Sequence, residues 1–498
     1  MRSELLLLLL PACTILSFKP MYPCVFDSST PESIPPDDST PPDDSTPPDD
    51  TSAPDRERAW GEADLIVVGT DGDLVGTSFT GADFRQDGGA DLAIGAPGCA
   101  VSGSALGCVY ILGSEGDPVT RPQGLITPRG VDAVAYGSGG GSFGAAIAAW
   151  TDAGTGAPSL AVGSPYIPFE ATYYGVSYLF VPPTSGVNDV QQTAFLLEGT
   201  SEDLLGTTVT NVGDVNADGR DDLVLGAPYD RYSGQSVGVA WLITDPVTGG
   251  GSPGDYGAAI YSGTSERIGA AVASLDNNED RFRDLVFGTT SFSPTSTDGG
   301  AWVLNGARQI SHALDNDAVP LFGSDGENAG ASVAAGADLD GDGHEDVAVG
   351  APQADSAAGR VYLVPGPITD ATDLSGVATR ISGSNPYMYV GSAVSFPGDV
   401  NGDGHPDLLT SGLVGYEPDQ VDGHGAVWLF YGPISGTLST DDADLVFLEE
   451  AANSGATPVL SRVGDVDGDG LDEIAFAYPY DSTNGDVTGA LYLFYGAP

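Results

Sequence analysis

Short runs of mainly apolar residues recur along the chain, each beginning at a glycine. Their alternating or wholly apolar character, bounded by glycine, is typical of strands that pack in a core. Seven copies cover residues 107–111, 175–179, 238–242, 300–304, 359–363, 425–429 and 489–493. A further apolar strand precedes the next repeat, as in Phe195 to Leu197 or Ala259 to Tyr261. The pattern predicts β structure throughout the repeats.

A second segment recurs in step with these strands. Acidic or amide residues stand at alternate positions, then glycine, then an acidic residue, and then an apolar run that often ends in Gly-Ala-Pro. The last acidic position is Asp91, Asp222, Asp284, Asp346, Asp407 or Glu473, and Ser159 holds that place in a degenerate copy. The seven copies are separated by 68, 63, 62, 62, 61 and 66 residues. A period this regular indicates a repeat architecture.

Four strands in each of seven repeats predict an all-β fold, a seven-bladed β-propeller of four-stranded blades. The last repeat stops at Phe494 to Gly496 without a fourth strand, whereas an unassigned apolar segment, Ala63 to Gly69, precedes the first repeat. We therefore expect this N-terminal segment to complete the last blade and close the ring. Closure removes the sheet edges that invite aggregation.

The acidic segments have the spacing of cation-binding loops. Asp338, Asp340, Asp342 and Asp346 occupy positions one, three, five and nine, with Gly343 at the turn. Oxygen ligands in a flexible loop favour Ca²⁺ over Mg²⁺, which demands a stricter octahedron. The equivalent residues are Asp214, Asn216, Asp218 and Asp222; Asp399, Asn401, Asp403 and Asp407; and Asp465, Asp467, Asp469 and Glu473.

Three copies depart from this pattern. Asp276, Asn278, Asp280 and Asp284 keep the ligands in blade four, but Arg281 replaces the glycine. In blade one Arg85 replaces the position-three ligand beside Asp83, Asp87 and Asp91, and blade two has Thr151, Ala153, Thr155 and Ser159, so no metal is expected there. The sequence predicts about five to six calcium ions, and the metal and the fold should be coupled because clustered carboxylates repel one another.

The charge of the chain limits its partners. Seventy acidic and sixteen basic residues give a formal net charge of -54 among 498 residues. Such a charge repels nucleic acid and anionic membranes and suits cations or a saline medium. We expect no nucleic-acid partner, and a membrane only through a lipid anchor.

The first 58 residues differ in composition from the repeats. Residues 1–24, with leucines from Leu5 to Leu10, resemble an export leader that is too short to span a bilayer. Cys13 lies in a lipobox-like sequence, and both lipidation and its absence remain open. Residues 25–58 repeat Pro-Pro-Asp-Asp-Ser-Thr, which predicts an extended tether or a disordered leader. The propeller is assigned to residues 59–498, exported to the cell envelope, the outer surface or the medium.

Two smaller features complete the candidate sites. Cys99 and Cys108 flank a Gly/Ser-rich loop and are expected to form a disulfide in an exported protein. Loops between the second and third strands must emerge opposite the cation loops, and they are rich in aromatic residues. This predicted ligand face comprises Tyr166, Phe169, Tyr173, Tyr174, Tyr229, Tyr232, Tyr387, Tyr389, Tyr416 and Tyr480. These side chains could contact a protein or glycan or could pack between loops.

Phe143-Gly144, the cation loop and Gly226 to Pro228 resemble the FG-GAP repeat of integrin α chains, over roughly residues 62–498. The resemblance implies a seven-bladed propeller with calcium in the loops between first and second strands and adhesion through the opposite face. We expect a binding or scaffolding module and no enzyme. A glycan- or lipid-acting enzyme and a purely structural envelope protein are the alternatives.

Overall fold

A computed structural model describes residues 57–496 except for short segments. The segments outside the description are 102–103, 106, 114–123, 128–129, 138–140, 152–156, 170–171, 192, 201, 233–234, 245, 263–266, 291–298, 307–310, 417–422, 450–455 and 482–486. The predicted export leader with Cys13, and all but the last two residues of the predicted tether, therefore lie outside the described residues, as do Ala153 and Thr155. Within them, no helix has the length and apolar character to cross a membrane.

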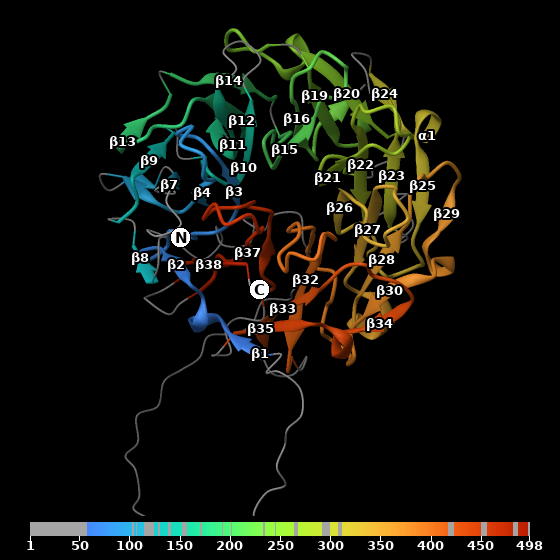
Figure 1. Cartoon of the computed structure of the whole chain (residues 1–498). Helices are drawn as coiled ribbons and strands as arrows, with labels where there is room; N and C mark the ends of the chain where they lie inside the picture. The colour runs from blue at the N-terminus through green and yellow to red at the C-terminus, as the bar shows by residue number, and fades with distance from the viewer. Residues whose placement is uncertain are drawn as a thin grey trace, which may run out of the picture.

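Seven sheets stand around a common centre, as Figure 1 shows, so the predicted seven-bladed β-propeller is confirmed for the described part of the chain. Blade one contains β3 (Phe79–Ala82), β4 (Asp91–Ala96), β7 (Cys108–Leu112) and β9 (Ala133–Tyr136). Blade two contains β10 (Ala146–Thr151), β11 (Pro158–Phe169), β12 (Thr172–Phe180) and β14 (Phe195–Glu198). Blade three contains β15 (Thr208–Gly213), β16 (Asp222–Ala227), β19 (Val239–Ile243) and β20 (Gly257–Tyr261).

The remaining four blades repeat this antiparallel order. Blade four contains β21 (Ala271–Leu275), β22 (Asp284–Thr289), β23 (Gly300–Leu304) and β25 (Val319–Phe322). Blade five contains β26 (Ser332–Ala337), β27 (Asp346–Ala351), β28 (Arg360–Val364) and β30 (Thr379–Ser382). Blade six contains β31 (Val394–Ser395), β32 (Leu408–Val414), β33 (His424–Phe430) and β35 (Leu445–Leu448). Blade seven contains β36 (Val459–Leu460), β37 (Ile474–Tyr478), β38 (Ala490–Phe494) and β2 (Leu65–Val68).

Most blades have a fifth strand that the sequence did not predict. Each of these strands comes just before the outer strand of one blade in the sequence. It pairs in parallel with the outer strand of the preceding blade in the ring. These strands are β13 (Gly186–Asp189), β24 (His312–Ala313), β29 (Thr372–Asp373), β34 (Thr437–Ser439), β1 (Glu57–Ala59) and β8 (Gly124–Ile126). They are short, and their residues are mainly exposed or half-buried, so they carry no hydrophobic period that could reveal them.

Short elements decorate the loops. The hairpins pair β5 (Ala100–Val101) with β6 (Ser104–Ala105) and β17 (Arg231–Tyr232) with β18 (Gln235–Ser236). Single helical turns are η1 (Trp60–Glu62), η2 (Pro253–Asp255), α1 (Leu314–Asp317), α2 (Ala354–Ala357), η3 (Leu374–Gly376) and η4 (Thr440–Asp442).

The N-terminal segment lies in blades six and seven. β2 pairs antiparallel with β38, with Leu65 opposite Leu493 and Val68 opposite Ala490. Its other edge pairs in parallel with β8, which comes from the segment leading to blade one. β1 pairs with β35 of blade six and begins at Glu57, inside the segment predicted as a tether. Three consecutive blades therefore exchange strands where the two ends of the ring meet (Figure 1).

The apolar core is divided between the blades. Seven clusters of buried side chains occur among the described residues, each between two neighbouring sheets. The cluster between blades seven and one includes Leu65, Leu491, Leu92 and Tyr110, all at most 2% exposed. Because this interface is as buried as the others, the stacking of sheets continues across the junction between the last and first repeats.

Paired glycines let neighbouring blades approach closely. Gly206, at φ +84°, donates its N–H to the carbonyl of Gly226 in its own blade at 2.9 Å. A Cβ on Gly163 of the preceding blade would collide with the carbonyl of Gly206. Gly206 therefore requires the left-handed conformation that glycine adopts readily. Gly163 is required because any side chain there would prevent the close approach of the two blades.

The first strands surround a central channel. Its volume is about 730 Å³, and residues from all seven blades line it. One lining residue from each blade, in order, is Thr80, Ala148, Thr210, Ala273, Ala335, Ser395 and Ser461. Small side chains at these positions leave the channel open.

Candidate functional site

The cation loops connect the first and second strands, where the sequence predicted them. In blade five, Gly343 donates its N–H to Asp338 Oδ2 at 2.9 Å, and Leu339 donates to Asp346 Oδ2 at 2.8 Å. Asp340 Oδ1 accepts an N–H from position five at 3.1 Å. His344 donates its N–H to Asp342 Oδ1 at 2.9 Å. The backbone therefore holds all four predicted ligand side chains before any cation binds.

Three carboxylates converge in each of two loops. In each, one oxygen from every carboxylate lies within 4.8 Å of the others; the groups are Asp338, Asp340 and Asp346, and Asp465, Asp467 and Glu473. The loops of blades three, four and six carry asparagine at position three. Their amide oxygens would add neutral ligands of the kind that calcium accepts.

Buried carboxylate oxygens fit a hard cation. Among the described residues, Glu473 Oε1 and Asp276 Oδ1 are buried and accept no hydrogen bond. Burial, together with the charges of Asp467 and Asp465, raises the pKa of Glu473 to about 8. Burial and nearby aspartates likewise raise the pKa of Asp222 to about 7. A divalent cation would supply the missing partner and the missing charge.

Blade four keeps the loop geometry although glycine is absent from its turn. Arg281 has φ 74°, close to the 81° of Gly219 at the same position in blade three. Its N–H bonds Asp276 Oδ2 at 2.9 Å, as the glycine N–H does elsewhere. The left-handed backbone is therefore imposed by the hydrogen bonds, against the preference of an arginine.

Replacing Arg281 with glycine is expected to stabilise the protein by about 1 kcal/mol, because glycine adopts the left-handed conformation without steric cost. Thermal unfolding of the Arg281→Gly variant in calcium measures this effect. Glycine in place of Asn278, which does not have a positive φ, is the control and should destabilise the protein. An Arg281→Gly variant that melts below the parent would contradict the prediction.

The loops of blades one and two differ more. In blade one, Arg85 Nε lies 3.0 Å from Asp91 Oδ1, within the group formed by the predicted ligands. In blade two, Ser159 stands at position nine and donates its hydroxyl to the carbonyl of Ala157 at 3.2 Å. Residues 152–156 lie outside the description, so the structure does not bear on the rest of that loop.

Neighbouring cation loops are joined around the channel. The position-eight carboxylate of one blade accepts the position-one N–H of the blade before it: Glu345 Oε2 bonds Asp276 N at 2.8 Å, and Asp472 Oδ2 bonds Asp399 N at 3.3 Å. Arg283 Nη1 also reaches Glu345 Oε2 at 2.5 Å. Position eight was not predicted to matter, yet it couples the position-one ligand to the next blade.

The predicted ligand face gathers two groups of tyrosines at the opposite ends of the strands. Tyr166 and Tyr173 pack edge-on with ring centroids 6.2 Å apart. Burial, with Tyr229 and Tyr480 nearby, raises the pKa of Tyr166 to about 12. Arg267 Cζ lies 5.2 Å from the ring centroid of Tyr229. These rings from blades two, three and seven form one aromatic group.

The second group belongs to blade six. Tyr389 and Tyr416 pack edge-on with centroids 5.9 Å apart, and Tyr387 beside them is 38% exposed. Tyr174 packs partly against the core, and so does Tyr480 of the first group. Phe169 lies in β11 and Tyr232 in β17, but their side chains are outside the description. We call the two groups together the tyrosine face.

Six residues on this end of the propeller share a strained backbone that the sequence did not predict, and of these only Tyr389 had been assigned to the ligand face. Each lies two positions before the repeat glycine and has a positive φ although it carries a side chain. They are Leu74, Ser142, Leu204, Arg267, Asn328 and Tyr389. Backbone strain of this kind clusters at functional sites. The six side chains are of five types, with leucine in two blades, so equivalent positions of the ring present a varied surface. No pattern within one repeat would have revealed it.

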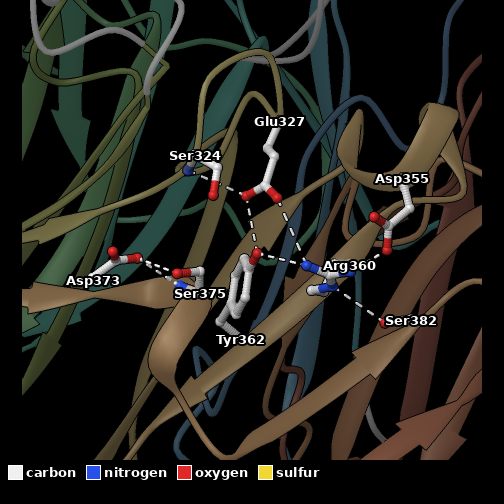
Figure 2. Close-up of polar contacts among 8 residues, drawn as sticks. All are labelled: Ser324, Glu327, Asp355, Arg360, Tyr362, Asp373, Ser375 and Ser382. Atoms are coloured by element: carbon white, nitrogen blue, oxygen red, sulfur yellow. Dashed lines mark hydrogen bonds and ion pairs between the residues drawn. The ribbon is translucent and has the colours of Figure 1, made fainter.

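A polar cluster supports this end of blade five, as Figure 2 shows. Arg360 donates to the hydroxyl of Tyr362 at 2.9 Å and to Ser382 Oγ at 3.2 Å, and it pairs with Asp355. The Tyr362 hydroxyl donates to Glu327 Oε2 at 2.9 Å, and burial raises the pKa of this tyrosine to about 12. The cluster ties the two loops of this blade together beside the tyrosine face.

The two cysteines that the sequence paired are joined. Cys99 and Cys108 form a disulfide with their Cα atoms 5.6 Å apart. The bond closes the loop that carries the β5–β6 hairpin, between the second and third strands of blade one.

Comparisons with known proteins agree with this geometry. A family model described as FG-GAP repeat matches residues 205–243 and 329–364, in blades three and five. Integrin alpha-PS2 of Drosophila melanogaster is 31% identical over 166 residues, which cover 32% of this chain and 11% of that protein. Integrin alpha-3 of Mus musculus is 34% identical over 197 residues, covering 37% and 17%.

A further relative is an enzyme by its name. Phosphatidylinositol-glycan-specific phospholipase D of Bos taurus is 30% identical over 198 residues, covering 38% of this chain and 21% of that protein. The matches thus span about a fifth or less of the length of these relatives. The chain is thus a seven-bladed β-propeller that contains FG-GAP repeats in blades three and five and has integrin α chains among its homologues.

Proposed function

We propose that this chain is an exported, calcium-binding propeller that acts at a cell surface as an adhesion, ligand-binding or scaffolding module. Calcium in the cation loops would stabilise one end of the ring, and a protein or glycan partner would bind the tyrosine face at the other end. The gathering of tyrosines from several blades, beside strained loops, is the observation that carries this proposal.

The chemistry of the tyrosine face supports a binding role. Tyr173 is 42% and Tyr387 is 38% exposed, so both rings are accessible to a partner. Tyrosine offers a flat apolar ring and a hydroxyl at little entropic cost, and it is enriched at energetically important contact positions. The strained loops that flank these rings hold the surface in one conformation before a partner arrives.

A protein and glycan array, probed with the calcium-loaded chain, tests the proposal. We expect a retained ligand whose affinity falls at least tenfold in the Tyr173→Ser, Tyr387→Ser double variant, because truncating central aromatic contacts costs more than about 1.4 kcal/mol. Phe322→Ser is the matched control, since Phe322 is also 42% exposed but lies in the outer strand β25. Equal binding by all three proteins would contradict the assignment of the face.

Similarity to the phospholipase D favours a second candidate, an enzyme acting on a glycolipid. To separate the two candidates, the chain is incubated with a glycosylphosphatidylinositol-anchored protein, and the amount of that protein released into solution is measured. We expect binding without turnover. Release that increases with the amount of added chain would favour the second candidate. Absence of both binding and turnover would favour a structural envelope protein.

A further inference from the structure

The cation loop of blade one has the backbone of the other loops but a different set of charges. Asp83 accepts N–H bonds from Asp87 at 2.9 Å and from Gly88 at 3.0 Å. The position-one aspartates of blades three, six and seven accept the same two bonds. The loop is therefore fully formed, and what distinguishes it is position three, where Arg85 replaces a ligand.

The side chain of Arg85 turns into the loop. The Nε of Arg85 donates to Asp91 Oδ1 at 3.0 Å, and its backbone N–H donates to Asp91 Oδ2 at 3.0 Å. The same Nε lies 3.5 Å from Asp87 Oδ2. The Asp91 side chain is 0% exposed and that of Arg85 only 25% exposed. The guanidinium thus contacts both the position-five and position-nine carboxylates.

A second position accommodates this guanidinium. Gly113 directly follows the third strand β7, and a Cβ there would collide with Arg85 Cζ and both terminal nitrogens. Every other blade has a side chain at the equivalent place; these residues are Val181, Thr244, Asn305, Pro365, Tyr431 and Tyr495. Blade one therefore departs from the repeat at two positions, and the two departures contact each other.

We infer that Arg85 is a built-in replacement for the metal ion of blade one. The delocalised guanidinium provides the positive charge and the N–H donors that satisfy the buried Asp91 carboxylate, and its permanent charge makes this independent of calcium. Asp83, Asp87 and Asp91 then hold no calcium, which leaves at most five occupied loops. The inference rests on the proposed calcium binding of those five loops.

The position of this blade gives the replacement a consequence. Ala90, at position eight of the same loop, donates its N–H to the carbonyl of Asp465 in blade seven at 3.3 Å. Blade one packs against blade seven at the junction of the two chain ends. The strand β8, from the segment that leads to blade one, also pairs with β2 of blade seven. An arginine here keeps the junction between first and last blades supported when calcium is withdrawn.

Hydrogen exchange of the full chain tests the inference directly. In excess chelator, we expect peptides covering 79–96 to keep their protection while peptides covering 332–351 lose theirs. Arg85→Met, which removes the charge but keeps an unbranched side chain, should lower protection of 79–96 in chelator. Asp340→Met, at the matched position of blade five, should lower protection of 332–351 only when calcium is present. Unchanged protection of 79–96 in folded Arg85→Met would overturn the inference.

Metal counting gives an independent readout. Arg85→Asp completes the oxygen ligand set of blade one, so bound calcium measured by elemental analysis should rise by one ion per chain over the parent. Six ions in the parent, or no increase in the folded variant, would overturn the inference. If neither protein binds calcium, the proposed calcium binding fails, whereas the exchange behaviour of Arg85→Met still decides whether the guanidinium supports the loop.

Discussion

Removal of calcium is expected to lower the melting temperature of this propeller by about 10–15 °C. Each occupied loop contributes about 2.7 kcal/mol when free calcium is about 100-fold above Kd, so four or five loops supply roughly 11–14 kcal/mol. A domain of about 440 residues has an unfolding entropy of about 0.9 kcal/mol per degree. The effect is large because a bound cation also removes the repulsion between the carboxylates of each loop.

Scanning calorimetry in calcium, in magnesium and in chelator measures this effect. Asp346→Asn, which weakens one loop, should remove about a fifth of the difference between calcium and chelator. Magnesium should restore little of it, since these loops offer flexible oxygen ligands. Equal melting temperatures in calcium and chelator would refute the metal assignment.

The pH dependence of the calcium effect follows from the position-nine carboxyl groups. Burial raises the pKa of Asp284, Asp346 and Asp407 to about 6, and of Glu473 to about 8, in the protein without metal. That form binds more protons folded than unfolded, so its stability falls as pH rises from about 4 to about 8. Calcium requires the ionised groups. The gain in melting temperature on adding calcium should therefore be greater at pH 8 than at pH 5.

Deletion of residues 57–69 is expected to abolish the soluble, closed ring. The deletion removes β2 and with it the partners of both β38 and β8. Leu65 and Val67 are 0% exposed, and burial of each contributes about 2 kcal/mol. Because the deletion also removes β1, the edges of β35, β38 and β8 all lose their partners. Unpaired strand edges of this kind template association between chains.

Size-exclusion chromatography with light scattering distinguishes the outcomes. A chain beginning at residue 57 is the matched control and should remain monodisperse with an unchanged melting temperature. A chain beginning at residue 70 should aggregate or unfold. Val67→Asp, which places a charge at the same buried interface without shortening the chain, should destabilise the ring strongly. A stable, monodisperse chain beginning at residue 70 would show that the N-terminal strand is dispensable.

Much of the architecture was readable from local patterns. The strand after each glycine and the acidic loop before β16 or β27 recur in one repeat length, so the number of blades followed from counting. The blades have about five strands and not four, because the added strands, such as β29, are held by main-chain pairing to another blade. Main-chain hydrogen bonds need no particular side chains, and so they leave no mark in the sequence.

The sequence by itself determined the repeat, the positions of the acidic and amide residues in the loops, and the ends of the strands at which the loops emerge. Each of these depends on residues close together in the chain, where spacing fixes geometry. Only the tertiary structure decided how Arg85 meets Gly113, how Glu345 reaches Asp276, and which tyrosines gather into one surface. These contacts join different strands or different blades, and their distances depend on how the sheets stack around the ring, which no single repeat specifies.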